Sequence, residues 1–401
     1  MSSIKQNKQR LKVLFAGVVL QFFLGIIYVW SVFKAPVSAY YGWNPSDVGL
    51  TASYMLCFFA AGILAGGKLQ MIIGVKFTTL IGGLMVSAGM LATSFIPAQG
   101  HAPVFLLYLF YGVIGGLGVG AAYNAIISNA QKWFPEKRGF ATGVSVCAFG
   151  FSTVIFAPFV EILNHNMNVN ITLLILSGVF AAATLSIFGF IKSPEQVPSV
   201  SAPVLKGKQY ATGEMIKTIR FYLITLSMMF GALVFLVVNP DLKDLAINRN
   251  ATSFATVLVM VLGISNALGR LCFPLLSDKI GSETTAVIAN ATSALAAFCL
   301  CFVGGVGLMA TVSVIAFCYG GCAGLYPVLV SDNFGIKNIG SNFGAVMIGF
   351  MLSALVFPFL ISKIDHQTIK FVTLGIFAAT SAVLIIFLRV INSKTKQKGG
   401  H

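Results

Sequence analysis

An arginine inside an apolar segment is the residue of this sequence best suited to bind a ligand. Arg270 lies in a run of mostly uncharged residues from about 252 to 275. A guanidinium keeps its proton, and in an apolar environment it needs an anion or several carbonyl groups around it. No Asp or Glu of the sequence falls at the middle of an apolar run, so a bound anion is the simplest partner. The alternative is that the side chain reaches toward the polar end of its helix near Ser277, about 10 Å away.

The spacing around Arg270 favours the binding site. Gly263, Asn266, Arg270 and Pro274 recur at the helical spacing i, i+3, i+7 and i+11, which places them on one face. A polar face through an otherwise apolar helix more often lines a cavity than contacts lipid. We therefore expect Arg270 to bind an anion and Asn266 to lie beside it.

Aromatic residues in other apolar runs supply further candidates for the same cavity. Tyr28 shares a helix face with Gln21 and Gly25, Tyr123 precedes Asn124, and Tyr319 shares a face with Cys322. Phe149 lies in the fifth apolar run. A tyrosine hydroxyl donates a hydrogen bond to a carboxylate oxygen, while its ring excludes water. For each of the four, core packing remains the alternative, and it is strongest for Phe149.

The composition shows what must position these residues. The chain has 401 residues, of which 57% are hydrophobic and only 9% charged, whereas a soluble domain carries about 25% charged residues. These values exclude a soluble enzyme, a disordered chain and a fibrous protein. The apolar runs are also much longer than the roughly 10 residues of a barrel strand, so they predict membrane-spanning helices.

Twelve such runs have the length of about 20 residues that a bilayer requires. The polar stretch between the sixth and the seventh run contains Pro194, Pro198 and Pro203 and predicts a linker. We expect an N-terminal six-helix bundle (1–192), a cytoplasmic linker (193–217) and a C-terminal six-helix bundle with a cytoplasmic tail (218–401). The expected spans are about 12–33, 48–72, 77–97, 103–130, 139–161, 170–191, 219–239, 252–275, 284–304, 308–330, 341–362 and 368–389.

The net charge of +15 follows from the membrane topology and does not indicate nucleic-acid binding. Most of the 26 Lys and Arg residues fall in loops on one side of the twelve-helix arrangement, which the positive-inside rule assigns to the cytoplasm. Both termini are then cytoplasmic. The first run is too long for a cleaved signal sequence, so we expect it to remain as the first helix.

No catalytic, metal or cofactor site is expected. The seven cysteines lie in apolar segments without a CxxC pair, and the four histidines fall in loops or tails. An enzyme within the membrane would need a nucleophile and a base, or a metal cluster, at depth. We therefore do not expect an enzyme.

An internal repeat supports two pseudo-symmetric halves. Residues 67–74, GKLQMIIG, correspond to residues 274–281, PLLSDKIG. The second copy resembles the Gly-x-x-x-Asp-Lys/Arg-x-Gly loop of the major facilitator superfamily, which latches helices on the cytoplasmic side. The resemblance implies the twelve-helix fold of that superfamily, with a latch made of Asp278, Lys279, Gly281, Gly74 and Arg138. The first copy has Met71 in place of the acid, so its latch should be weaker.

Several other segments resemble the oxalate/formate antiporter branch of the monocarboxylate transporter family. The most specific is 129–143, NAQKWFPEKRGFATG, which looks like the loop between the fourth and fifth helices. The other matches are 28–31 (YVWS), Asn266 with Arg270, 213–215 (GEM) and 331–335 (SDNFG).

This resemblance implies alternating access and a small carboxylate held by Arg270. Asn266, Tyr28, Tyr123 and Tyr319 then align with substrate-binding positions. Phe350 occupies the position where the oxalate carrier has a second cation. Because one cation neutralises one carboxylate, we expect monocarboxylates such as lactate, pyruvate or formate.

The predicted function is therefore secondary active transport of a small monocarboxylate. We expect proton coupling, with exchange of oxalate, formate or related anions as the alternative. The two halves would rock around the substrate as Tyr28 and Tyr123 close against Tyr319. We expect a multi-pass protein of the bacterial inner membrane that works as a monomer, with lipid and substrate as its partners.

Overall fold

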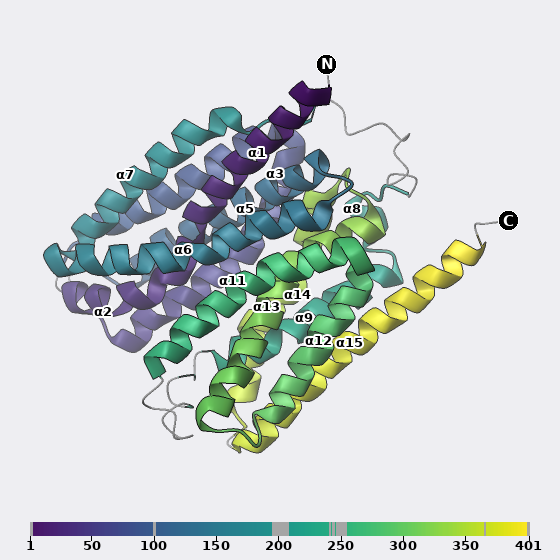
Figure 1. The fold of residues 1–401 in the computed structure, drawn as a ribbon. Coiled ribbons are helices and arrows are strands. Elements are labelled where there is room, and N and C mark those ends of the chain that lie inside the picture. The colour runs from purple at the N-terminus through teal and green to yellow at the C-terminus, as the bar shows by residue number, and fades with distance from the viewer. Residues whose placement is uncertain are drawn as a thin grey trace. The chain divides into compact units, whose positions relative to one another are not determined.

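The computed structural model describes residues 3–98, 102–194, 208–239, 242, 245, 255–364 and 366–398. Over these residues the regular structure is helical, as predicted (Figure 1). Ten helices of the described part are long and apolar enough to cross a membrane. The middle of the predicted linker, residues 195–207, lies outside the described residues.

The first half of the chain contains most of its irregular helical segments. Its first predicted span is divided by a 3₁₀ segment, and its fourth contains a π-helix after one short α-helical turn. The elements are α1 (Ser3–Leu24), η1 (Gly25–Val29), α2 (Trp30–Tyr41), α3 (Pro45–Ser94), α4 (Phe105–Leu107), η2 (Tyr108–Gly115), α5 (Gly116–Trp133), α6 (Arg138–Asn166), α7 (Val169–Ile187) and η3 (Phe188–Phe190).

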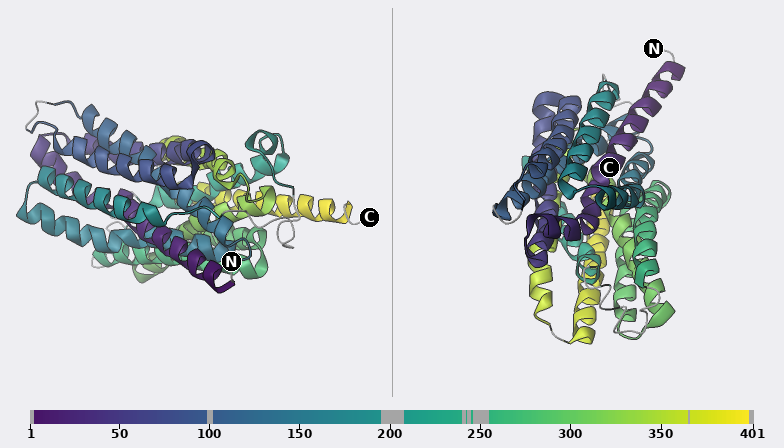
Figure 2. Two further views of the ribbon diagram at one scale, coloured as in Figure 1. Left: turned by 90° about the horizontal axis from the view of Figure 1, so that it is seen from above. Right: turned by 90° about the vertical axis from the view of Figure 1, so that its left-hand side faces the viewer.

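The second half begins with one short helix. The elements are α8 (Thr212–Met215), α9 (Ile219–Val238), α11 (Ala255–Ile280), α12 (Ser282–Cys299), α13 (Gly305–Phe334), α14 (Ile339–Ser362) and α15 (Gln367–Lys398). Helices α12 and α15 lie side by side, and α15 runs past the end of α12 toward the C-terminus (Figures 1 and 2).

Two glycines occupy equivalent places in the two halves. Gly74 interrupts α3 with φ 79°, so the 50 residues of α3 contain both the second and the third predicted span. Gly281 has φ 86° between α11 and α12. A positive φ favours glycine, which explains why both copies of the repeat end with this residue. With α3 counted as two spans and with the 18-residue α12, the predicted set of twelve helices is complete.

The described contacts divide the chain into two units. Unit 1 comprises residues 1–135, 148–206 and 339–345, and unit 2 comprises residues 136–147, 207–338 and 346–401. Helix α6 therefore starts in unit 2 and continues in unit 1, whereas α14 starts in unit 1 and continues in unit 2. The simpler domain division at the linker remains a prediction from the sequence.

Glycines bring α5 close to α3 in unit 1. A Cβ on Gly116 would collide with the carbonyl oxygen of Met55, and one on Gly120 with that of Phe59. These glycines lie four residues apart in the fourth expected span, and small residues at this spacing let the two backbones approach closely.

Glycines likewise fix α11 against α13 in unit 2. A Cβ on Gly269 would collide with the carbonyl oxygen of Phe317, and one on Gly320 with that of Asn266. Gly324 lies against the carbonyl oxygen of Arg270. The backbone on which Arg270 and Asn266 are carried is therefore packed directly on α13.

We predict that Gly269→Ala destabilises the protein by about 1–3 kcal/mol, because the added methyl group has no space against α13. The matched control is Gly263→Ala on the same helix, where a Cβ meets nothing within 4 Å. Thermal melting of the purified proteins in detergent compares the two. Equal melting temperatures would contradict the close packing of α11 on α13.

Candidate substrate-binding site

Arg270 is the largest fully buried side chain of the described chain, with 1% of its surface exposed. Its Nε donates a 2.9 Å hydrogen bond to Oδ1 of Asn266, one helical turn earlier. The sequence predicts that Asn266 binds substrate; in the structure its amide oxygen orients the guanidinium. This bond joins Nε to a neutral amide oxygen and adds no negative charge. A side chain that reached out to a polar interface would be more exposed than 1%.

Tyr319 on α13 is held by an aromatic partner in unit 2. Its ring stacks on Phe235 of α9 with centroids 4.1 Å apart and an angle of 12° between the planes, and 6% of the residue is exposed. Phe350 on α14 is also buried, with 7% exposed. Phe235 could not be predicted from the sequence, because it lies in a continuous apolar run that contains no polar neighbour to mark it.

Unit 1 brings together three of the predicted residues. The Phe149 ring on α6 lies edge-on to Tyr28 at 5.6 Å and to Tyr123 of α5 at 5.0 Å. Phe59 of α3 completes the cluster, 5.2 Å from Tyr123 and 6.0 Å from Phe149. Phe59 could not be separated by sequence from the adjacent Phe58.

The backbone around Tyr28 explains how this cluster forms. Tyr28 lies in η1, the 3₁₀ segment between α1 and α2, and such a segment within a spanning helix often marks a hinge. One turn earlier, a Cβ on Gly25 would collide with the carbonyl oxygen of Phe149. The close approach at Gly25 brings η1 onto α6 and places Tyr28 against the Phe149 ring.

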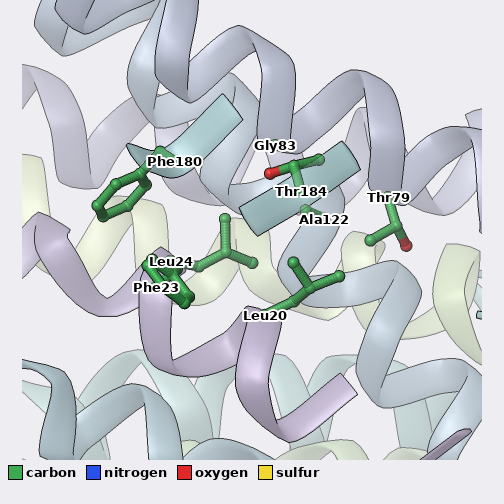
Figure 3. Close-up of a pocket in the computed structure, with 8 residues that line it drawn as sticks. All are labelled: Leu20, Phe23, Leu24, Thr79, Gly83, Ala122, Phe180 and Thr184. Atoms are coloured by element: carbon green, nitrogen blue, oxygen red, sulfur yellow. The ribbon is translucent and has the colours of Figure 1, made fainter. Parts of the chain in front are cut away.

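A small pocket elsewhere in unit 1 does not suit a carboxylate. Its volume of about 10 Å³ matches roughly one water molecule. Mainly apolar side chains surround it, and the hydroxyl of Thr79 is buried there without a hydrogen-bond partner (Figure 3). The lining residues are Leu20, Phe23, Leu24, Thr79, Gly83, Ala122, Phe180 and Thr184. Among the described residues, no group of three or more His, Cys, Asp or Glu is placed to hold a metal ion.

The predicted latch residue Asp278 caps the start of α6. Its two carboxylate oxygens accept hydrogen bonds from the backbone N–H groups of Gly139 at 2.9 Å and Phe140 at 2.8 Å. A carboxylate at a helix N-terminus satisfies free N–H groups and complements the helix dipole. A Cβ on Gly139 would collide with the carbonyl oxygen of Pro274, so glycine is needed at this contact. Lys279 is exposed at the end of α11.

Arg138 forms the second part of this network in unit 2. Its guanidinium lies 2.6 Å from a carboxylate oxygen of Asp332, and it also contacts the hydroxyl of Ser331 at 3.5 Å. Ser282 donates a hydrogen bond to the other oxygen of Asp332 at 2.5 Å. Asp332 belongs to the SDNFG motif quoted above, and Arg138 was predicted as a latch residue, but the sequence did not indicate that the two side chains pair.

Unit 1 holds the start of α14 with neutral groups. The Ser341 hydroxyl donates to the carbonyl oxygen of Gly67 at 2.7 Å and lies 2.8 Å from the sulfur of Met71. Asn124 donates to the carbonyl oxygen of Gly340 at 2.8 Å, and Gln70 lies against the same glycine. The residue at the first-copy position of Asp278 is Met71, so the charged cap has no counterpart there.

We predict that Asp278→Ala loosens the start of α6, because losing an N-cap costs about 1 kcal/mol. Trypsin cleavage at Lys137, in the exposed turn before α6, should become about fivefold faster. Lys279→Ala, which changes the exposed neighbouring residue, serves as the control. Cleavage at the same rate in wild type and Asp278→Ala would contradict a stabilising cap.

Comparison with known proteins shows the family. The family model described as Major Facilitator Superfamily matches residues 13–358 and 221–400. The chain therefore belongs to the Major Facilitator Superfamily and is a membrane transporter.

Individual relatives agree with this assignment. The chain is 28% identical to the oxalate:formate antiporter of Oxalobacter formigenes over 78% of this chain and 74% of that protein. It is 28% identical to monocarboxylate transporter 12 of Rattus norvegicus over 37% of this chain and 29% of that one. The proton:xylose symporter XylE has the same fold, with a TM-score of 0.72 and 14% identity over 95% of this chain and 96% of that chain. The resemblance seen in the sequence to the oxalate/formate branch is confirmed.

Proposed function

We propose that the protein carries small monocarboxylates across a membrane by alternating access, with Arg270 as the anion-binding residue. The observation that carries the proposal is the buried guanidinium on a spanning helix, oriented by the neutral amide of Asn266. A guanidinium can bind a carboxylate as a fork through two of its N–H groups. The relatives named for oxalate, formate and monocarboxylate transport support the same substrate class.

A single negative charge on the substrate suits this chain best. Phe350 stands where the resemblance places a second cation in the oxalate carrier, and it is buried. A second carboxylate left without a cation in an apolar cavity would cost several kcal/mol. Lactate, pyruvate and formate are therefore preferred. Exchange of oxalate for formate is the alternative, because the relative from Oxalobacter formigenes carries that name.

The aromatic residues close the cavity in this proposal. Tyr28, Tyr123 and Tyr319 contribute hydroxyl groups and rings, and Phe149 supports the first two through its edge contacts. Substrate uptake is coupled to protons, which enter with the substrate anion at Arg270. The protein works as a monomer in the bacterial inner membrane with both termini in the cytoplasm, where the excess of Lys and Arg favours that orientation.

Uptake of labelled L-lactate into proteoliposomes tests the proposal. An inward proton gradient should drive uptake, and an excess of unlabelled oxalate should leave it unchanged. Uptake that does not depend on the proton gradient would contradict the proposed proton coupling. If lactate is not taken up while oxalate or formate exchanges, the monocarboxylate assignment is wrong and the antiport alternative holds.

A further inference from the structure

The described residues on either side of 195–207 are held at or beside turns where the chain passes from one unit to the other. The first turn, residues 134–137, leads from α5 into α6, and the unit boundary falls between residues 135 and 136. The second turn, residues 335–338, leads from α13 into α14, and the boundary falls between 338 and 339. These are the two places where a helix starts outside the unit that contains the rest of it.

The first linker end is held within unit 1. The carbonyl oxygen of Lys192 accepts hydrogen bonds from Nδ2 of Asn129 at 3.1 Å and from Nε1 of Trp133 at 2.7 Å. Asn129 is buried and Trp133 is the last residue of α5. The linker therefore starts directly beside the turn into α6.

The second linker end is held more extensively within unit 2. The N–H of Tyr210 donates to the carbonyl oxygen of Phe334 at 3.0 Å, and its own carbonyl oxygen accepts from Nδ2 of Asn338 at 2.9 Å. Oε1 of Gln209 accepts from the N–H of Lys337 at 3.1 Å. Gly335, with φ 83°, lies against the Gln209 side chain, so this side chain covers the turn.

The segment just after these residues is itself ordered. Glu214 on α8 accepts a hydrogen bond from the N–H of Ala211 at 3.1 Å and lies 3.7 Å from Nζ of Lys208. The edge of the Tyr210 ring meets Phe334 with centroids 5.6 Å apart. Phe334 belongs to the SDNFG segment, and Tyr210 lies three residues before the GEM segment. Both segments are motifs noted in the sequence that have no part in anion binding.

We propose that Gln209 and Tyr210 act as an anchor that positions the 335–338 turn and thereby controls the release of α14 from unit 1. The inference rests on alternating access, because only a carrier that changes its access must release this helix start. Residues 339–345 directly follow the anchored turn. The hydrogen bonds described above that hold them in unit 1 all come from neutral groups. A turn held in place keeps the start of α14 in register with these partners, and a loosened turn frees it. Gln209 is thus a positioning residue that does not touch the substrate.

Hydrogen–deuterium exchange of the purified carrier without substrate tests the anchor. Gln209→Leu removes the oxygen that accepts from Lys337, whereas Gln209→Glu keeps an oxygen at that place. Exchange in residues 339–345 should rise about fivefold in Gln209→Leu, as expected for the loss of one hydrogen bond, and stay near wild type in Gln209→Glu. Asn166→Ala, at the far end of α6, is the control for a general loss of order. Faster exchange confined to residues 209–217 would overturn the proposal.

Transport kinetics provide the second measurement, with lactate, formate and oxalate as probes. Gln209→Leu should change the maximal rate about fivefold with KM less affected, and Gln209→Glu should restore the rate. If the start of α14 exchanges faster in Gln209→Leu but the maximal rate is unchanged, the anchor does not control transport. If wild type moves none of the three anions, the proposed function fails, while the exchange comparison still decides whether the anchor holds α14.

Discussion

Arg270→Gln is expected to reduce carboxylate transport about a hundredfold or more while leaving the amount of folded protein in the membrane unchanged. The substitution removes the positive charge and the two-pronged geometry that binds both carboxylate oxygens, and each hydrogen bond to a charged group contributes about 1.5–3 kcal/mol. The measurement is the initial rate of labelled anion uptake into proteoliposomes, normalised to the reconstituted protein.

Arg389→Gln is the matched control, because Arg389 is exposed near the end of α15. It should transport at the wild-type rate. Arg270→Lys separates charge from geometry: it keeps the charge but loses the fork, so we expect an intermediate rate. If Arg270→Gln transports at the wild-type rate, Arg270 is not part of the binding site.

Asn266→Asp is expected to make transport depend strongly on acid. The new carboxylate would lie at the position of an oxygen 2.9 Å from Nε of Arg270, where it neutralises the guanidinium and competes with the substrate anion. At pH 7 the rate should fall about tenfold or more. It should recover as the pH is lowered and the introduced carboxylate is protonated. The measurement is the pH profile of substrate exchange with the same anion on both sides.

Asn266→Ala is the control for this substitution. It removes the hydrogen bond without adding a charge, so it should lower the rate through poorer orientation of Arg270 and leave the shape of the pH profile unchanged. If Asn266→Asp and Ala give the same profile, Asn266 does not lie close enough to the substrate charge for this account to hold.

Charge and helical spacing carried most of what the sequence could predict. Arg270 was recognisable as a candidate binding residue because a charge in an apolar membrane span is energetically costly and usually functional. The repeat was recognisable because Gly74 and Gly281 both adopt a positive φ, which restricts the residue type in both copies. The twelve spans followed from the length that a bilayer requires.

The features that the sequence could not predict depend on contacts between distant segments of the chain. The Phe59 and Phe235 rings lie in uniformly apolar runs, and their contacts with the Tyr123 and Tyr319 rings follow only from helix packing. The exchange of the starts of α6 and α14 between the units has no periodic signal. The role of Asn266 was also underdetermined, because its position one turn before Arg270 allows it to bond either the substrate or the guanidinium.

Binding of labelled carboxylate to the purified protein is the most direct test of the central claim, because it needs neither a gradient nor a full transport cycle. Wild type should bind lactate, pyruvate or formate saturably, and Arg270→Gln should show no saturable binding although its melting temperature is unchanged. Equal saturable binding to both proteins would contradict the account, since it would place the anion at a site other than the buried guanidinium of α11.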